Sequence, residues 1–227
     1  MEKNISGSTI KKNVSNLLES LPGGTVLIAA TKTRTHDEIE AAIAGGVAII
    51  GENYVQEAEA KFAVLKDKVS FHLVGHLQKN KVKKAVKIFD MIQTLDSKEL
   101  AVFLARECEK IHKVMPVLIE INSAGESQKS GIDIGRAEEL VREVMKHPSL
   151  SLEGLMTMGP ASSDDEAVRS AFCATKGLFD RIGSTYPQLS NWQYLSMGMS
   201  DSYTTALSCG ANMVRIGTLL FGPRRMR

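Results

Sequence analysis

The chain alternates short apolar runs with longer stretches in which apolar residues recur at helical spacing. Eight runs are bounded by polar residues or glycine, and they occupy residues 25–31, 47–51, 70–75, 88–95, 115–122, 152–159, 192–198 and 211–217. Runs rich in Val, Ile, Leu and Met without strict alternation are typical of parallel strands that are buried on both faces. The pattern therefore predicts eight strands that alternate with helices.

Four of the predicted helix starts carry a capping oxygen followed three residues later by Glu or Gln. These pairs are Thr35 with Glu38, Asn53 with Gln56, Asp96 with Glu99, and Ser163 with Glu166. Eight β-α units in about 200 to 250 residues match the size of one (β/α)8 barrel. We therefore expect an α/β protein with a single TIM-type barrel domain over residues 1–227. Residues 1–24 would form an N-terminal helical extension that caps the barrel bottom or packs outside it.

A doubly wound open sheet is the competing architecture for alternating strands and helices. Such sheets that bind dinucleotides carry a G-x-G-x-x-G sequence after the first strand. Here the first run is followed by "TKTRTHDE", which contains no glycine. This difference favours the barrel.

Charge and composition give little support to nucleic-acid or membrane partners. The formal net charge of +2 is small, and the basic stretch 79–87 keeps Val82, Ala85 and Val86 at the spacing of a solvated helix. The first residues contain no apolar signal region, and no run approaches the ~18 apolar residues of a membrane span. We expect a cytoplasmic protein that binds neither nucleic acid nor membranes.

The cysteines and histidines do not predict a metal site. Cys108, Cys173 and Cys209 lie far apart within apolar or helical patterns, which favours reduced core thiols over a disulfide framework. His72 and His76 are four residues apart, but "FHLVGH" has the pattern of a strand that runs into a glycine turn. No metal ion is expected.

Lys32 is the first candidate for chemistry, because it lies where the first apolar run ends. In a (β/α)8 barrel the loops after the strands build the active site, so residues at strand ends gather on one face. Lys32 is in phase with Val26, Ile28 and Ala30, and if these residues face the interior, its amine enters the top of the barrel. A lysine that only extends its amine to solvent is the alternative.

The last two strand ends suggest a phosphate site on the same face. Gly198 permits a tight turn, and Ser200 is placed to cap the next helix and leave backbone N–H groups for an anion. Gly217 allows close backbone approach, and Thr218 adds a hydroxyl and an amide. Loops after strands seven and eight often hold a phosphate in barrels of this class.

An amine beside a phosphate site suits a phosphorylated aldehyde or ketone, which can form a Schiff base with the lysine. Pyridoxal 5′-phosphate (PLP) and the sugar phosphate of an aldolase both fit this description. Arg215 is in phase with Gly217. Because arginine stays protonated, a guanidinium that faces a pyridine nitrogen would donate to it and keep it unprotonated.

Seven segments along the chain form a distinctive set: "TKT", "GENYVQEA", "HLVGHLQKNK", "KSGI", "GLMTMGP", "LSMGMSDS" and "VRIGTLLFG". Together they resemble the pyridoxal phosphate homeostasis protein family, whose barrel is also that of the alanine racemase N-terminal domain (PLP fold type III). The resemblance covers about residues 25–224. It implies a Schiff base on Lys32, with Asn53 lining the cofactor site and Arg215 facing the ring nitrogen. It also implies that the phosphate is held by Ser200, Gly217 and Thr218.

The resemblance further implies a role in intracellular PLP homeostasis, as a buffer, supplier or donor to apo-enzymes, without substantial amino-acid turnover. We expect a monomer, with a weak dimer as the alternative. The enzymatic alternatives are an amino-acid racemase and, less well supported, a Schiff-base aldolase. Racemases take a second acid/base from an extra C-terminal domain, which is not expected here because the sequence ends at Arg227.

Three further features lie near the same face. His76 could border the cofactor mouth, although a plain loop histidine is equally consistent with the sequence. Lys129 could contact a phosphate or take the cofactor transiently during transfer, but the pattern favours a solvated loop lysine. Four methionines that flank two strand ends are expected to provide adaptable packing at the barrel top; they are Met156, Met158, Met197 and Met199.

Overall fold

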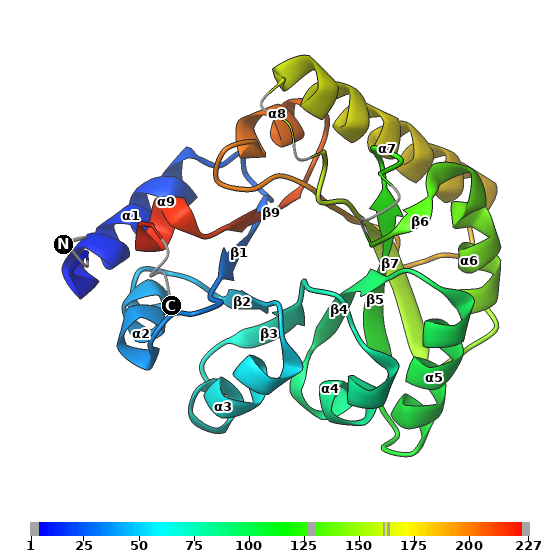
Figure 1. Cartoon of the computed structure of the whole chain (residues 1–227), viewed down its shortest axis with the longest axis horizontal. Coiled ribbons are helices and arrows are strands. Elements are labelled where there is room, and N and C mark those ends of the chain that lie inside the picture. Colours follow the sequence, from blue (N-terminus) through cyan, green and yellow to red (C-terminus); the bar gives the residue numbers. More distant parts are fainter. Residues whose placement is uncertain (1–4, 127–129, 161, 163, 224–227) are drawn as a thin grey trace.

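Eight parallel strands close into a barrel, as Figure 1 shows for this computed structural model. The structure describes residues 5–126, 130–160, 162 and 164–223. Pairing of β4 with β5 closes the barrel, and the short strand β6 extends the sheet beside the end of β5. The strands are β1 (Val26–Ala30), β2 (Ile49–Glu52), β3 (Ser70–Leu73), β4 (Met91–Leu95), β5 (Met115–Asn122), β6 (Ile132–Asp133), β7 (Leu150–Met156), β8 (Tyr194–Ser196) and β9 (Met213–Ile216).

Helices surround the barrel on its outer side (Figure 1). Within the described ranges, none of them is long and apolar enough to cross a membrane. They are α1 (Gly7–Ser20), α2 (His36–Ala44), α3 (Val55–Leu65), α4 (Val82–Ile88), α5 (Lys98–Glu109), α6 (Ala137–Val144), α7 (Asp165–Thr185), α8 (Tyr203–Ser208) and α9 (Thr218–Phe221), with short 3-10 turns at Lys79–Lys81 and Ile134–Arg136.

The predicted alternation of eight strands with helices is confirmed, and the open sheet is excluded. One strand start is wrong: the run 88–95 was expected to be extended throughout, but β4 begins at Met91. Ile88 instead ends α4, where it joins Val82, Ala85 and Val86 on the buried face of that helix. Short apolar runs look alike in a buried helix and a buried strand, which explains the difference.

One of the predicted helix caps is confirmed. Thr35 and Glu38 form a reciprocal capping box at the start of α2. Asn53 does not cap α3, because that helix begins one residue later with Tyr54 as its N-cap and no side-chain cap bond. The Asn53 side chain is therefore available at the top of the barrel.

The other two helix starts are also displaced by one residue. The cap of α5 is Ser97 rather than Asp96, and its side chain accepts a hydrogen bond from the amide of Leu100. The cap of α7 is Asp164, whereas the predicted Ser163 lies outside the described residues. Adjacent polar residues compete for the cap, and the capping box alone does not rank them.

The barrel interior contains a small apolar cluster beneath the strand ends. It consists of Ile28, Met91, Leu118, Met156 and Met213, one residue from each of five strands. Because Ile28 faces inward, the phase inferred for the first strand is correct. The much larger core lies between the strands and the surrounding helices.

The N-terminal helix packs outside the barrel rather than across its bottom. Helix α1 lies beside α2 and α9 (Figure 1). Asn13 donates to the carbonyl of Leu220 at 3.1 Å, and Ser15 donates to the carbonyl of Gly45 at 3.2 Å. Ile10 and Val14 are fully buried in this contact.

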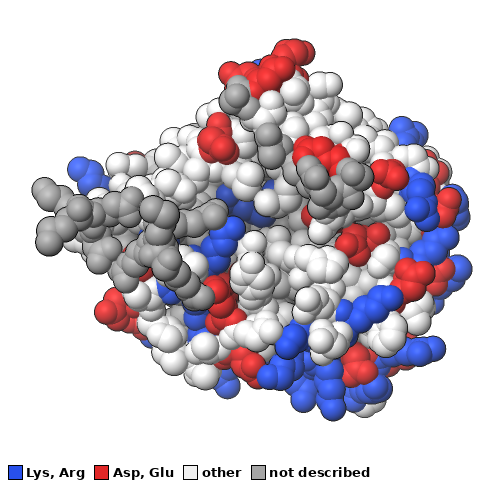
Figure 2. Space-filling model, viewed as in Figure 1, with Lys and Arg blue, Asp and Glu red and all other residues white. Residues whose placement is uncertain are grey.

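The basic stretch 79–87 forms an exposed helical surface, as its spacing predicts. Lys83, Lys84 and Lys87 are exposed, and Lys84 pairs with Glu59 at 2.8 Å. Figure 2 shows basic side chains at the lower right of the visible face, interspersed with acidic ones. Such a surface produces no large field of one sign.

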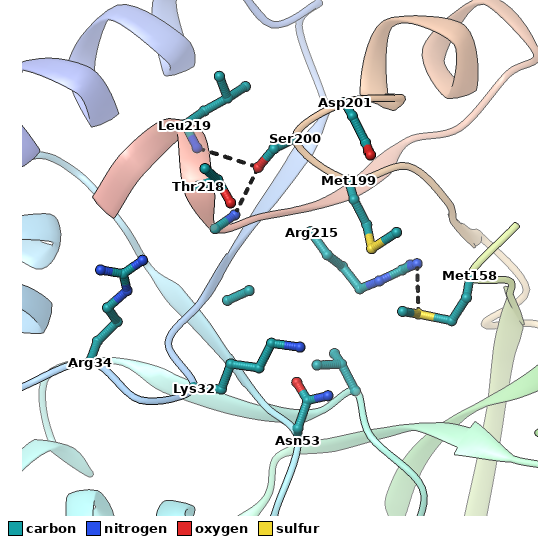
Figure 3. A pocket seen from close by; sticks show the side chains of 13 residues that line it. Lys32, Arg34, Asn53, Met158, Met199, Ser200, Asp201, Arg215, Thr218 and Leu219 are labelled. Atoms are coloured by element: carbon teal, nitrogen blue, oxygen red, sulfur yellow. Dashed lines mark hydrogen bonds between the residues drawn. The ribbon is translucent and has the colours of Figure 1, made fainter. Parts of the chain in front are cut away.

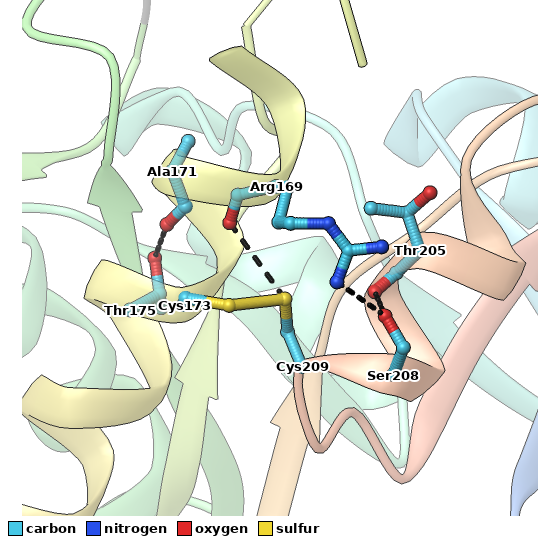
Figure 4. The surroundings of a disulfide bond; sticks show 7 residues. All are labelled: Arg169, Ala171, Cys173, Thr175, Thr205, Ser208 and Cys209. Carbon is cyan, nitrogen blue, oxygen red and sulfur yellow. Dashed lines mark hydrogen bonds between the residues drawn. A yellow bond between two sulfur atoms is a disulfide. The ribbon is translucent and has the colours of Figure 1, made fainter. Parts of the chain in front are cut away.

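The expectation of three reduced core thiols is wrong. Cys173 of α7 is bonded to Cys209 at the end of α8 (Figure 4), with their Cα atoms 5.2 Å apart. Cys173 is exposed on its helix, whereas Cys108 is a free, buried thiol whose pKa burial raises to about 11. Sequence spacing does not reveal that α7 and α8 lie side by side.

Opening this disulfide should destabilise the protein. The bond closes a separation of 36 residues, and loss of such a constraint on the unfolded chain lowers the free energy of unfolding by about 3 to 4 kcal/mol. Urea unfolding with and without reductant measures the difference. A Cys173→Ser, Cys209→Ser variant should not respond to reductant. Finding both thiols free to alkylation in the air-oxidised native protein would contradict the pairing.

Candidate functional site

A cavity of about 510 Å³ opens at the carboxyl ends of the strands. It gathers residues that follow β1, β2, β3, β7, β8 and β9 (Figure 3). Its lining comprises Ala30, Lys32, Arg34, Asn53, Val74, Met158, Met199, Ser200, Asp201, Arg215, Gly217, Thr218 and Leu219. The structure thus brings together all six residues that the sequence analysis assigned to a cofactor site.

A tight turn after β1 positions Lys32. The amide of Arg34 donates to the carbonyl of Thr31 at 3.0 Å, and Thr33 adopts a left-handed conformation with φ 64°. The amide of Thr33 donates to the carboxylate of Glu57 at 3.2 Å. Lys32 is half-buried, and Figure 3 shows its side chain extending into the cavity.

Arg34 connects this turn to the last helix. Its guanidinium donates to the carbonyl of Phe221 at 3.1 Å and to that of Gly222 at 2.6 Å. It also lies over the ring of Phe221, 5.3 Å from the ring centre. The first β-α loop of the barrel is therefore joined to the C-terminal end of α9 at one edge of the cavity.

A buried ion pair between Lys61 and Glu52 lies next to the positions of Lys32 and Asn53 in the chain. Lys61 of α3 donates to the carboxylate of Glu52 at 2.5 Å and to the carbonyl of Thr31 at 2.7 Å. The Thr31 hydroxyl donates to the same carboxylate oxygen. Burial raises the pKa of Glu52 despite the stabilising charge of Lys61. The pair fixes the ends of β1 and β2 immediately before the two site residues.

Ser200 does not cap the helix that follows it. Helix α8 begins later, with Ser202 as its N-cap, and the turn depends on Gly198 at φ 91°. The Ser200 hydroxyl instead accepts hydrogen bonds from the amides of Gly217 at 3.3 Å and Leu219 at 3.4 Å (Figure 3). Ser200 therefore reaches across to the start of α9.

Two backbone N–H groups thus converge on one oxygen at the cavity wall. Gly217 and Leu219 supply the amides, and Thr218 lies between them and lines the same wall. Convergent amides at a helix start carry partial positive charge that favours an anion. This arrangement suits a phosphate oxygen.

Arg215 is held rigidly at the base of the cavity. Its guanidinium donates to the hydroxyl of Ser196 at 2.7 Å and to the carbonyl of Thr157 at 2.8 Å. Ser196 donates to Gln93 at 2.7 Å, and the amide nitrogen of Gln93 lies 3.0 Å from Nδ1 of His72. The chain of bonds fixes the direction of the guanidinium.

Arg215 and His72, at the two ends of this chain of hydrogen bonds, differ in protonation. Burial lowers the pKa of Arg215 to about 10, so the guanidinium remains charged at neutral pH. Burial lowers the pKa of His72 to about 4, so the imidazole is neutral. Because Gln93 donates through its amide group, Nδ1 of His72 acts as the acceptor.

Sequence reasoning missed this polar layer inside the barrel. His72, Gln93, Glu120 and Ser196 are buried polar residues within strands of mainly apolar character. The sequence could have revealed them as isolated polar residues at strand positions whose side chains face the barrel interior. Arg34 and Asp201 were also missed as lining residues.

A second cavity of about 280 Å³ adjoins the first and shares Asn53, Val74 and Met158 with it. His76 lines this second cavity rather than the first, and its Nδ1 lies 3.4 Å from Asp96. Lys129 lies outside the described residues. The described side chains contain no group of three or more His, Cys, Asp or Glu residues suited to a metal ion.

The four methionines that were expected to pack at the barrel top occupy two kinds of environment. Met156 belongs to the inner barrel cluster and Met197 to the outer core. Met158 and Met199 line the larger cavity, where they provide flexible apolar side chains.

Comparisons with known proteins agree with this geometry. The model of the alanine racemase N-terminal domain matches residues 5–225. A pyridoxal phosphate homeostasis protein from Pasteurella multocida is 36% identical over 99% of this chain and 97% of its own. PipY of Synechococcus elongatus, solved with PLP bound, is 31% identical with a TM-score of 0.86, covering 94% of this chain and all of PipY.

A more distant structure shares the fold alone. Alanine racemase from E. faecalis is 18% identical, with a TM-score of 0.74 over 96% of this chain and 59% of the racemase. The fold and the site thus define a barrel protein of the alanine racemase N-terminal domain class. Within that class, the chain belongs to the pyridoxal phosphate homeostasis protein family.

Proposed function

We propose that this protein binds PLP as a Schiff base on Lys32 and serves in intracellular PLP homeostasis. One observation carries the proposal: Lys32 opens into the same cavity as the convergent amides of Gly217 and Leu219. An amine and an anion site within one cavity of about 510 Å³ match an aldehyde that carries a phosphate. The PLP-bound relative from Synechococcus elongatus supports the choice of PLP over a sugar phosphate.

Each site residue has a role in this proposal. Ser200, Gly217 and Thr218 hold the phosphate, while Asn53 lines the cavity beside Lys32. Arg215 faces the pyridine nitrogen as a donor. When bound, PLP supplies an electron sink, which is strongest when the ring nitrogen is protonated. A charged guanidinium at that nitrogen opposes its protonation and weakens the sink.

The proposed role is to buffer PLP, supply it or deliver it to apo-enzymes, without substantial amino-acid turnover. Among the described lining residues, the ionisable side chains are Lys32, Arg34, Asp201 and Arg215. The two guanidinium groups do not exchange protons at neutral pH. The described residues of this wall therefore include no tyrosine, cysteine or histidine that could act opposite Lys32 as a second acid/base.

Borohydride reduction of the PLP-loaded protein, followed by peptide mass spectrometry, tests the proposal. We expect a pyridoxyl group on the peptide that contains Lys32. Incubation of the loaded protein with L-alanine should give no racemisation at ordinary enzymic rates of ~1 to 1,000 per second. A pyridoxyl group located mainly on another peptide would refute the site, and racemase turnover would refute the non-enzymatic role.

The phosphate assignment makes a separate prediction. A Ser200→Ala, Thr218→Val variant should bind PLP about 10- to 150-fold more weakly, since a lost charge-assisted hydrogen bond costs about 1.5 to 3 kcal/mol. Binding of unphosphorylated pyridoxal should change little. Absorbance titration with both compounds measures the difference, and equal weakening of the two would contradict a phosphate role for these residues.

A further inference from the structure

Glu120 is a buried carboxyl group that the proposed function does not use. It is in phase with Leu118 of the inner cluster, so its side chain faces the barrel interior, where it is only 5% exposed. Its Oε2 atom has no hydrogen-bond partner among the described residues. Buried carboxyl oxygens without partners are unfavourable, so such an oxygen indicates a missing donor.

The second cavity, of about 280 Å³, offers a place for that donor, because Glu120 lines it. Ser123 and Thr157 line the same cavity, and their hydroxyl oxygens lie 2.9 Å apart. Thr157 donates to the carbonyl of Ile121 at 2.9 Å and accepts from the amide of Gly159 at 3.2 Å, so Ser123 donates to Thr157 and keeps its own oxygen as an acceptor. The cavity therefore presents the Glu120 carboxyl group and the Ser123 hydroxyl oxygen to a small ligand.

The carboxyl groups of Glu120 and Asp96 favour a ligand with a positive charge. Burial, followed by the negative charge of Asp96, raises the pKa of Glu120 to about 7, against the opposing influence of Arg215. Arg215 directs its hydrogen bonds to Ser196 and Thr157 and forms no described ion pair with Glu120. A cation beside Glu120 would offset the repulsion between the two carboxyl groups.

We propose that the second cavity binds the ammonium group of a small primary amine through Glu120, with Ser123 as a neighbouring polar contact. An ammonium group is compact and carries three donors, which suits a carboxyl group and a hydroxyl oxygen in a small space. A metal ion would require a set of ligands that the described residues do not form here.

The position of this site beside the larger cavity indicates what a bound amine could do there, and this step rests on the proposed function. The two cavities share Asn53, Val74 and Met158, so an amine bound at Glu120 lies next to the cavity assigned to PLP. A primary amine is the chemical class that can replace Lys32 in a Schiff base. In that exchange the aldehyde carbon would form its C=N bond to the incoming nitrogen as its bond to the lysine nitrogen breaks. The incoming nitrogen would lose its protons, the lysine nitrogen would gain them, and no oxidant is required.

The binding itself can be tested on PLP-free protein, which separates it from the proposed function. Ethylammonium chloride would be titrated into the ¹⁵N-labelled protein, with ethanol as the neutral analogue and sodium chloride as the salt control. We expect saturable NMR shifts at the amides of Gly75 and Gly159 with ethylammonium alone. Glu120→Gln should weaken binding at least tenfold, whereas Glu19→Gln, which changes an exposed carboxyl group on α1, should not.

A measurement on the unmodified protein covers the case in which Glu120→Gln fails to fold. Saturating ethylammonium should lower the midpoint of the Glu120 carboxyl titration by one pH unit or more, with Asp96, His76 and Arg215 as the neighbouring charged groups. An unchanged midpoint, equal shifts with ethanol, or equal shifts with sodium ions would each overturn the amine site. Failure of PLP to bind would leave these results interpretable.

Discussion

Replacing Lys32 by alanine is expected to abolish the borohydride-stable PLP adduct and the visible absorbance that accompanies it. The side chain of Lys32 supplies the amine at the larger cavity, and no other lysine is among the described lining residues. Lys61 lies nearby, but its amine is paired with Glu52 and donates to the carbonyl of Thr31. A protonated amine held in this way has no lone pair with which to attack an aldehyde.

The control for this variant is Lys12→Ala, which removes an exposed lysine on α1. It should retain the full adduct and the wild-type absorbance. Equilibrium dialysis should show that the Lys32→Ala protein still binds PLP reversibly, because the convergent amides of Gly217 and Leu219 remain. An adduct of wild-type yield in the Lys32→Ala protein would show that another lysine is the covalent partner.

The sequence predicted the grouping of the site residues because that grouping follows from topology. Parallel strands that alternate with helices place all strand ends on one face, so Lys32, Ser200 and Gly217 had to meet there once the order of elements was known, whereas the site role of Asn53 was implied by the family resemblance. The inward phase of Lys32 followed from the alternation along β1, which Ile28 confirms. Local periodicity and chain order carried this information.

Contacts between distant segments could not be predicted in the same way. Ser200 had the sequence context of a helix cap, but its hydroxyl accepts from amides at the start of α9, 17 and 19 residues away. Cys173 and Cys209 had the context of core thiols, yet they are bonded between α7 and α8. Such pairings depend on how the loops and helices pack, which one sequence does not encode in its periodicity.

The polar layer was missed for another reason. A single polar residue in an apolar run is compatible with either an exposed strand face or a satisfied interior position. Only the closed barrel shows that His72, Gln93 and Ser196 share one hydrogen-bonded chain that ends on Arg215. Residues that orient a site are therefore harder to predict than residues at strand ends.

Replacing Lys61 by methionine is expected to lower the free energy of unfolding by about 3 to 5 kcal/mol, because it leaves the buried carboxylate of Glu52 unpaired. Glu52 is fully buried and Lys61 is 7% exposed, so water cannot replace the lost ammonium group. Burial already raises the pKa of Glu52, and loss of Lys61 raises it further. Urea unfolding should therefore show a smaller loss at pH 5, where Glu52 more readily takes up a proton, than at pH 8.

The matched control is Lys68→Met, since Lys68 pairs with Glu40 at 2.6 Å with both side chains about half exposed. Loss of this surface pair should change stability by less than about 1 kcal/mol. A Glu52→Gln, Lys61→Met double variant should recover much of the loss, because the unpaired charge is removed together with its partner. Equal losses for Lys61→Met and Lys68→Met would mean that the ion pair beneath Lys32 and Asn53 does not hold the strand ends.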